Sequence, residues 1–350
     1  MRPLQPENKV AIAAAATVQL PPDPFATCAT LLAKIEEQIQ RAEAIRGDAS
    51  LAEDEWKKAV DLCNNAIEGN KEYWRFYYLK GIAVKEATEC QMRRGMDLDE
   101  GTQIMIRASK LAIDEFSKCI KLNSNHAPAY VKRARARSQL KSEIEDIAEK
   151  NALLKLALKD ANEAIRLDSN SWEAYEIRAH LCDYAENYAQ AIRDYTDCIR
   201  LNPTYAFAYY CRAGTYVSDD QRNRALNDYA TAIHLDPKFG GCYCARARLH
   251  KIMGNPDQAI ADLTRAIDID AKDRSSLSDR AEIYCELGRF NDAVNDYTEV
   301  IRQNPDRYRS YYERGNAYLR SKQCEKAISD FDESISQKGI LTRLFAILSF

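Results

Sequence analysis

Small, apolar and charged residues recur through the second half of the chain at a fixed spacing. An Arg followed by a small residue recurs at a constant spacing, the distance in sequence from Arg178 to Arg212. Within each of these periods an Ala follows at a fixed offset, then a large residue (Tyr, Leu or Phe), and then an Ile. The columns are Arg178, Arg212, Arg246, Arg280 and Arg314; Ala191, Ala225, Ala259, Ala293 and Ala327; Tyr195, Tyr229, Leu263, Tyr297 and Phe331; and Ile199, Ile233, Ile267, Ile301 and Ile335. Apolar residues at i, i+3, i+4 and i+7 mark one helix face, so each period predicts a pair of helices.

Residues that end helices have the same spacing. Gly254 and Gly288 lie where the first helix of a pair has to stop, and a Pro column that includes Pro237 and Pro305 closes the second helix. Small residues such as Ala213 let the two helices approach closely. No such pair can bury its own apolar face, so we expect neighbouring pairs to stack.

This order of aromatic, small, Ala, aromatic and Pro positions resembles the tetratricopeptide repeat. One unit reads Tyr209, Ala213, Tyr216, Ala225, Tyr229, Ala232 and Pro237. The resemblance implies an all-α fold, a right-handed α-solenoid of stacked helix-turn-helix hairpins. It also implies a concave face lined by the first helix of each hairpin, and a chain that holds other proteins.

The register continues upstream with insertions between the two helices of a unit. We expect lengthened helices there, with a protruding turn near Gly95–Gly101, and about eight hairpins in all. The predicted segments are a flexible leader over 1–25, a divergent hairpin over 26–73, a unit with a long insertion over 74–126, a unit with a shorter insertion over 127–171, five regular units over 172–341, and the start of an apolar helix over 342–350.

Composition narrows the classes of partner and compartment. The net charge of −3 on 350 residues favours neither nucleic acid nor a membrane surface as a partner. Eleven Cys occur singly, without disulfide spacing, which indicates free thiols and a cytoplasmic location. The apolar run after Lys9 is a poor secretory signal because Pro3, Pro6 and Glu7 interrupt the region before it. No segment reaches the length of a transmembrane helix.

Chemical motifs are sparse. The four His residues follow no metal-ligand spacing, and no phosphate loop or nucleophile elbow occurs. Cys242 and Cys244, with Cys211 and Cys285 on neighbouring helices, make a soft-metal site conceivable, but buried thiols in a repeat core are the commoner case. We therefore expect a protein that is not an enzyme and takes no cofactor and no metal.

Each Arg of the column is followed at a constant offset by an Asp. These acids are Asp194, Asp228, Asp262, Asp296 and Asp330. Two interpretations are open: the Arg residues line a groove for acidic ligands, or each pairs with its Asp and fixes the hairpin. The matched acids favour the internal pair.

Positions i, i+3, i+7 and i+10 of each first helix predict the residues that face a partner. An aromatic and small patch at Phe207, Tyr210 and Gly214 has the composition of a binding hot spot. Of the Lys and Asn positions that some family members use to clamp a peptide carboxylate, only Asn316 is present, which disfavours that ligand. The predicted partner-binding residues are Glu176, His180, Phe207, Tyr210, Gly214, Arg248, Lys251, Glu282, Tyr312 and Asn316.

The last segment is apolar on every side, which a solvated helix is not. Leu344, Phe345, Leu348 and Phe350 either cap the last hairpin or form a docking end for a partner or for self-association. The leading hypothesis is a cytoplasmic scaffold or adaptor that takes a peptide or helix of another protein in its groove. A permanent structural subunit of a larger assembly is the alternative, and a regulatory module of an enzyme is a third.

Overall fold

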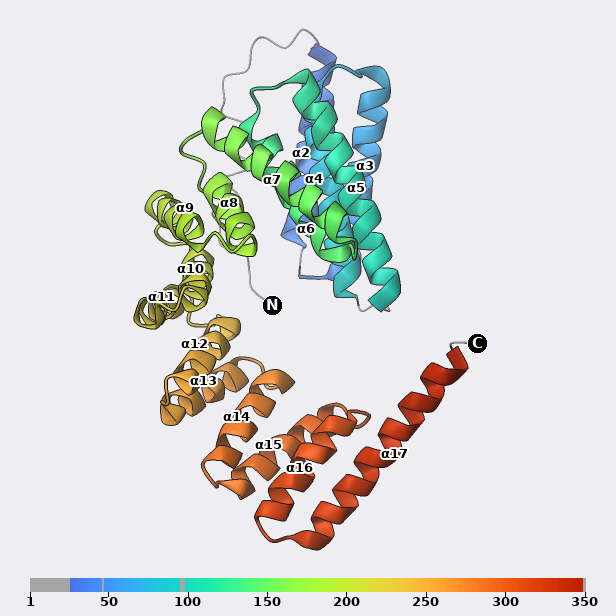
Figure 1. The fold of residues 1–350 in the computed structure, drawn as a ribbon. Coiled ribbons are helices and arrows are strands. Elements are labelled where there is room, and N and C mark those ends of the chain that lie inside the picture. The colour runs from blue at the N-terminus through green and yellow to red at the C-terminus, as the bar shows by residue number, and fades with distance from the viewer. Residues whose placement is uncertain (1–25, 46, 95–97, 349–350) are drawn as a thin grey trace. The chain divides into compact units, whose positions relative to one another are not determined.

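The computed structural model describes the backbone of residues 26–45, 47–94 and 98–348, and all the regular structure in these ranges is α-helical. The leader expected over 1–25 lies outside them. The helices are α2 (Ala26–Ala44), α3 (Ala49–Gly69), α4 (Trp74–Arg93), α5 (Leu98–Leu122), α6 (Ala127–Glu143), α7 (Ile147–Leu167), α8 (Trp172–Tyr184), α9 (Tyr188–Leu201), α10 (Ala206–Ser218), α11 (Arg222–Leu235), α12 (Gly240–Ile252), α13 (Pro256–Ile269), α14 (Arg274–Glu286), α15 (Phe290–Gln303), α16 (Tyr308–Arg320) and α17 (Cys324–Leu348) (Figure 1).

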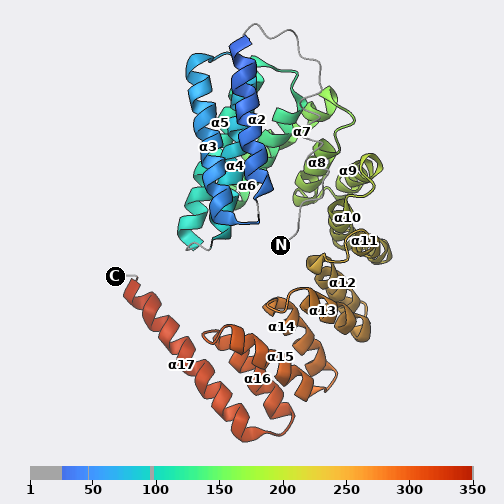
Figure 2. The same cartoon turned by 180° about the vertical axis from the view of Figure 1, so that it is seen from behind.

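The chain divides into two compact units, Met1–Pro203 and Thr204–Phe350. Helices α2 to α9 belong to the first unit and α10 to α17 to the second. In both, each helix packs against the next to form a hairpin, and each hairpin stacks on its neighbour (Figures 1 and 2). The predicted all-α stack of helical hairpins is confirmed, with eight pairs among the described residues.

The upstream insertions lengthen helices, as the sequence predicted. In the regular pairs the first helix has 13 residues, as in α8, and the second has 14, as in α9, except for α17, which has 25. In contrast, α4 has 20 residues, α5 has 25, α6 has 17 and α7 has 21. Of the turn expected near Gly95–Gly101, residues 95–97 lie outside the described part, and Gly101 lies inside α5.

A left-handed residue separates the two helices of each regular pair. Gly254 and Gly288 have φ of 76° and 74°, a conformation that glycine adopts without steric cost. Beyond Gly254, the amide of Asn255 donates to the carbonyl of His250 at 2.9 Å, which closes the end of α12. The other pairs place Glu186, Asp220 and Lys322 in the same conformation.

Helices α4 and α16 each place a glycine against a phenylalanine ring on the second helix of the pair. A Cβ atom at Gly81 would lie 2.6 Å from the ring of Phe116, and one at Gly315 would lie 2.8 Å from that of Phe331. In the other regular pairs the small residue is Ala and the ring position holds Tyr or Leu. Ring and small residue are therefore matched within each hairpin.

Helix α17 differs from the expected end of the array. The sequence placed a new first helix at about Thr342, whereas α17 runs without a break from Cys324 to Leu348. The segment is therefore a continuation of the last second helix (Figure 1). The side chains of Leu344, Phe345 and Leu348, and the whole of Phe350, lie outside the described part, so the predicted docking end stays a prediction.

Candidate functional site

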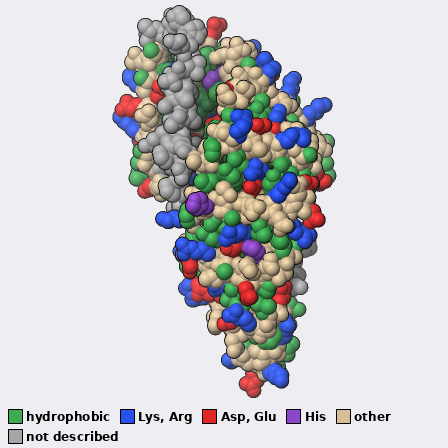
Figure 3. All heavy atoms as spheres, turned by 90° about the vertical axis from the view of Figure 1, so that its left-hand side faces the viewer, with side chains coloured by type: hydrophobic (Ala, Val, Ile, Leu, Met, Phe, Trp, Pro, Cys, Tyr) green, Lys and Arg blue, Asp and Glu red, His purple; other side chains and the backbone are tan. Residues whose placement is uncertain are grey.

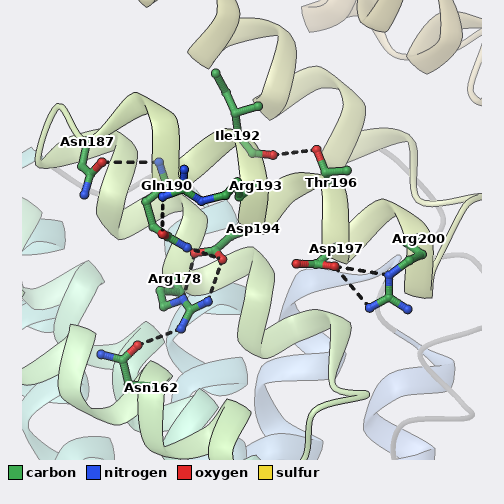
Figure 4. Close-up of polar contacts among 10 residues, drawn as sticks. All are labelled: Asn162, Arg178, Asn187, Gln190, Ile192, Arg193, Asp194, Thr196, Asp197 and Arg200. Atoms are coloured by element: carbon green, nitrogen blue, oxygen red, sulfur yellow. Dashed lines mark hydrogen bonds and ion pairs between the residues drawn. The ribbon is translucent and has the colours of Figure 1, made fainter.

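The Arg column forms two-pronged ion pairs inside each regular hairpin. In every pair the Arg Nε and Nη2 atoms donate to the two carboxylate oxygens of the Asp at sequence offset 16, at 2.7 to 2.9 Å. Figure 4 shows this for Arg178 on α8 and Asp194 on α9. In the upstream hairpins, Arg133 binds Asp160 in the same way, and Lys80 lies 2.9 Å from Glu115.

The same arginines also reach back to the preceding hairpin, a contact that the sequence analysis missed. The Nη1 atom donates to a side chain on the second helix of the previous pair, so one guanidinium joins three helices. The contacts are Arg133 to Ser117 at 3.0 Å, Arg178 to Asn162 at 2.9 Å, Arg280 to Thr264 at 2.9 Å and Arg314 to Thr298 at 3.1 Å. The residue at the equivalent position before Arg246 is Ala230, which has no side-chain acceptor.

These pairs are structural. In the five regular hairpins the Arg side chains are 15 to 22% exposed and the Asp side chains at most 10%. The paired Asp raises the pKa of Arg178, Arg246, Arg280 and Arg314 by hydrogen bonding to the charged form. The guanidinium donors are thus used within the fold, and the internal-pair interpretation of the column is confirmed.

The first-helix face of the second unit, formed by α10, α12, α14 and α16, carries a cluster of aromatic rings. Phe207 and Tyr210 on α10 have ring centroids 5.8 Å apart. Phe239, which precedes α12, lies 6.3 Å from Phe207 and 4.8 Å from Tyr210. The three rings are only partly buried, and burial raises the pKa of Tyr210. Phe239 was missed by the sequence analysis, although Tyr205, one repeat earlier, has the same phase.

Open space adjoins this cluster. Gly214 lies one helical turn after Tyr210, and a Cβ atom built there meets no atom within 4 Å. This contrasts with Gly315, where the ring of Phe331 fills the space. Gly214 is therefore not required by packing, and it leaves a partly apolar surface accessible beside the rings.

Arg248 and Lys251, both predicted as partner contacts, form a basic strip on α12 that is already paired with α14. Arg248 donates to Asp279 at 2.9 Å and to Ser275 at 3.2 Å. Lys251 lies 3.0 Å from both Glu282 and Glu286. Two residues predicted as separate partner contacts, Lys251 and Glu282, bind one another, because the stacking places these oppositely charged side chains on adjacent first helices. The strip is an inter-repeat contact, with solvent-exposed charges.

A cleft of about 640 Å³ lies between α14 and α16 on the same unit. Apart from Tyr297, the residues that line it are polar or charged, with charges of both signs. The lining includes Asp270, Lys272, Asp273, Arg274, Asp279, Glu282, Arg307, Arg309 and Glu313. Acidic and basic side chains are also interspersed in the space-filling view of Figure 3. The first-helix face thus changes from aromatic at α10 to charged at α14.

The remaining predicted residues lie in different settings. Tyr312 on α16 is 51% exposed, with its ring 5.8 Å from that of Phe331, and Asn316 is partly buried one turn later. In the first unit, Glu176 is only 4% exposed and accepts from Arg135 at 2.5 Å, so it is an internal partner, whereas His180 on the same helix is exposed.

The eleven cysteines all lie in the described part of the chain and form no disulfide bond with one another, and most are buried. Burial raises the pKa of Cys63 and Cys119 to about 12, which keeps both protonated. Within residues whose side chains are described, no group of three or more His, Cys, Asp or Glu is arranged to hold a metal ion. Among the described helices, none is long and apolar enough to cross a membrane.

Family models of the tetratricopeptide repeat match several of the regular hairpins. The tetratricopeptide repeat model matches residues 173–205, 241–273 and 308–339, and a second model described as a TPR repeat matches residues 281–322. A search of curated protein sequences finds no match.

Solved structures resemble this chain at low sequence identity, and two of them, with TM-scores of 0.55 and 0.50, share its fold. Yeast Tom70 is 16% identical with a TM-score of 0.55, over 90% of this chain and 63% of that one. PilF of Pseudomonas aeruginosa is 15% identical with a TM-score of 0.50, over 63% of this chain and 92% of that one. A MamA protein is 18% identical with a TM-score of 0.47, over 50% of this chain and 96% of that one.

Proposed function

We propose that this chain, a tetratricopeptide-repeat protein, is a non-catalytic scaffold that binds a peptide or helix of another protein on the first-helix face of its second unit. The observation that carries the proposal is the aromatic cluster of Phe207, Tyr210 and Phe239 beside the open space at Gly214. Partly exposed aromatic rings next to an unfilled space are what an apolar anchor residue of a partner needs.

The neighbouring charges determine how such a ligand is oriented. The ring cluster belongs to α10 and the start of α12, while exposed ion pairs of Arg248 and Lys251 lie farther along the same face. Exposed ion pairs contribute little to stability, so they can exchange their partners for charges of a ligand at low cost. An extended segment with an apolar anchor and flanking polar residues fits this surface.

A cytoplasmic location is part of the proposal. It is supported by the lack of disulfide bonds among the eleven cysteines, all of which lie in the described part of the chain and several of which are completely buried. Free thiols are typical of reducing compartments.

The proposal is tested by a steric block that leaves the fold intact. A photo-crosslinking amino acid at Tyr210 identifies the captured partner, with the same group at the exposed His234 on α11 as the control. The captured segment is then titrated against Gly214→Leu and Gly214→Ala. We expect Leu to weaken binding at least about tenfold and Ala to change it little. Equal affinity for wild type and Gly214→Leu would show that the partner binds elsewhere.

A further inference from the structure

The outward face of α17 exposes residues whose equivalents are covered in the preceding repeat. Ile328 is 60% exposed and Ile335 is 69% exposed. Their equivalents one repeat earlier are Val294, which packs in the cluster that contains Ala317 of α16, and Ile301, which is 8% exposed. The face of α17 is thus a surface of the type that accepts a following first helix.

A carboxylate lies between the two isoleucines. Asp332 lies two positions after Asp330. The residues at the equivalent position in earlier hairpins accept the Nη1 hydrogen bond of the next arginine, and they are Ser117, Asn162, Thr264 and Thr298. Asp332 is exposed to solvent. It therefore presents a charged acceptor at the position that binds an incoming arginine.

We propose that this end face, composed of Ile328, Asp332 and Ile335, docks a helix of a partner protein. That helix carries a four-residue pattern: an Arg, then a small residue, then any residue, then an aliphatic residue or Ala. The pattern is that of the chain's own stacking helices, which read Arg280, Ala281, Glu282, Ile283 on α14 and Arg314, Gly315, Asn316, Ala317 on α16. In both cases the fourth residue is buried in a cluster with a residue at the Ile328 phase, Ile260 or Val294. The surface is separate from the aromatic cluster of the proposed function.

The chemistry favours an arginine-bearing helix over the other occupants. A guanidinium facing Asp332 forms a charge-assisted hydrogen bond, which is stronger than the bond to a threonine. A second copy of the chain packed through α17 in an antiparallel pair would bring the same acidic face, with Asp332, against itself. In the sequence after Asp332, the repeat frame places Leu348 at the arginine phase, and α17 continues to that residue.

The probe is a fluorescent synthetic peptide of residues 306–322, the sequence of α16 with its flanks. A lactam between position 309, changed from Arg to Lys, and Glu313 holds its helix, since an isolated helix of this length is marginal. We expect anisotropy titration with the full chain to show binding that Asp332→Asn weakens about tenfold or more. Ile335→Ser should weaken it as well, and a peptide with Arg314→Gln should behave like the Asp332 variant.

Glu333→Gln is the matched control, because it removes the same charge at the adjacent position and should leave affinity unchanged. Asp332→Arg should bind a peptide carrying Arg314→Glu better than it binds the original peptide. Equal binding to wild type and Asp332→Asn, or no binding up to millimolar peptide, would overturn the proposal. Light scattering that shows a dimer of the chain alone, dissociated by Ile335→Ser, would assign the face to a second copy instead.

Discussion

Arg280 and Asp296 are joined by two parallel hydrogen bonds, Nε to Oδ2 at 2.8 Å and Nη2 to Oδ1 at 2.7 Å, across the two helices of one hairpin. Both side chains are largely buried, so removing one leaves the other charge unpaired away from water. We expect Arg280→Gln and Asp296→Asn each to lower the free energy of unfolding by about 3 kcal/mol, and the double variant to lose much less than the sum. A double-mutant cycle from urea unfolding measures the coupling, and strict additivity would mean that the pair contributes nothing.

Arg246 lacks a side-chain acceptor on the preceding hairpin, so adding one there should raise the free energy of unfolding. Ala230→Thr places a hydroxyl at the position facing Arg246, in the way that Thr264 serves Arg280. One added hydrogen bond is worth about 1 kcal/mol, reduced by the lower helix propensity of Thr. Ala230→Val is the control, because it has the same shape without the oxygen. Unfolding of both variants should show Thr more stable than Val, and the reverse order would contradict the three-helix contact.

Gly315 on α16 and Gly214 on α10 should respond oppositely to Ala. Gly315→Ala drives a Cβ atom to within 2.8 Å of the ring of Phe331, so it should destabilise by about 1 to 3 kcal/mol. Adding Phe331→Leu should restore part of the loss, since Leu263 faces Ala247 in another repeat. Gly214→Ala meets open space in a helix interior and should stabilise by about 0.5 to 1 kcal/mol. Thermal melts of the three variants test these signs.

Tyr210 and Tyr312 occupy equivalent positions in their repeats, but their side chains differ in burial. Tyr210 contacts Phe239 and Tyr229, whereas Tyr312 is 51% exposed. Tyr210→Ala should therefore cost about 2 kcal/mol of unfolding free energy and Tyr312→Ala less than about 1 kcal/mol, while helicity by circular dichroism changes little in either. If Tyr210→Ala proves no more destabilising than Tyr312→Ala, the aromatic cluster does not pack in solution.

One histidine makes the first unit sensitive to acid. Burial lowers the pKa of His126 from 6.5 to about 4, with the nearby charge of Arg75 as a smaller cause. Its ring packs against Trp74 and Tyr78. Below pH 6.5 the His126 imidazole is protonated in the unfolded chain, whereas in the folded chain it stays neutral down to about pH 4. Its contribution to the free energy of unfolding is therefore complete above pH 6.5 and declines as the pH falls toward 4.

His126→Phe should flatten that dependence, because Phe keeps the ring packing and does not titrate. The comparison is urea unfolding at pH 7 and pH 5, with the exposed His234→Phe as the control variant. A pH difference that is the same in wild type and His126→Phe would assign the acid sensitivity to other groups.

Much of the fold was accessible from the sequence because one constant period repeats the same local rules. Columns such as Arg280 with Asp296 are fixed offsets within one hairpin, and a single chain displays them directly. Gly101 was misplaced because an isolated glycine is compatible with a helix interior at modest cost. The continuation of α17 was missed because apolar residues past the last repeat continue a helix as readily as they begin one.

Less of the candidate site was predictable, since it depends on contacts between repeats. Position in the frame placed Lys251 and Glu282 on the same face, but not within 3.0 Å of each other. Phe239 precedes its helix, outside the positions assigned to a partner. The hydrogen bond from Arg280 to the preceding hairpin could have been sought at the sequence position of Thr264. The acceptors at this position are Ser, Asn or Thr in different hairpins, so no single residue type marks the column.

The missing acceptor at Ala230 has a mechanical consequence. Elsewhere in the second unit, Arg280 and Arg314 tie each hairpin to its predecessor, so tension along the array loads a guanidinium at those joints. Between α11 and α12 that tie is absent, and the load falls on packing and on weaker contacts such as the one from the Cys242 thiol to the Tyr229 carbonyl at 3.5 Å. Because this joint lacks the directional bond that reinforces the later ones, the second unit pulled from its ends should part first between α11 and α12.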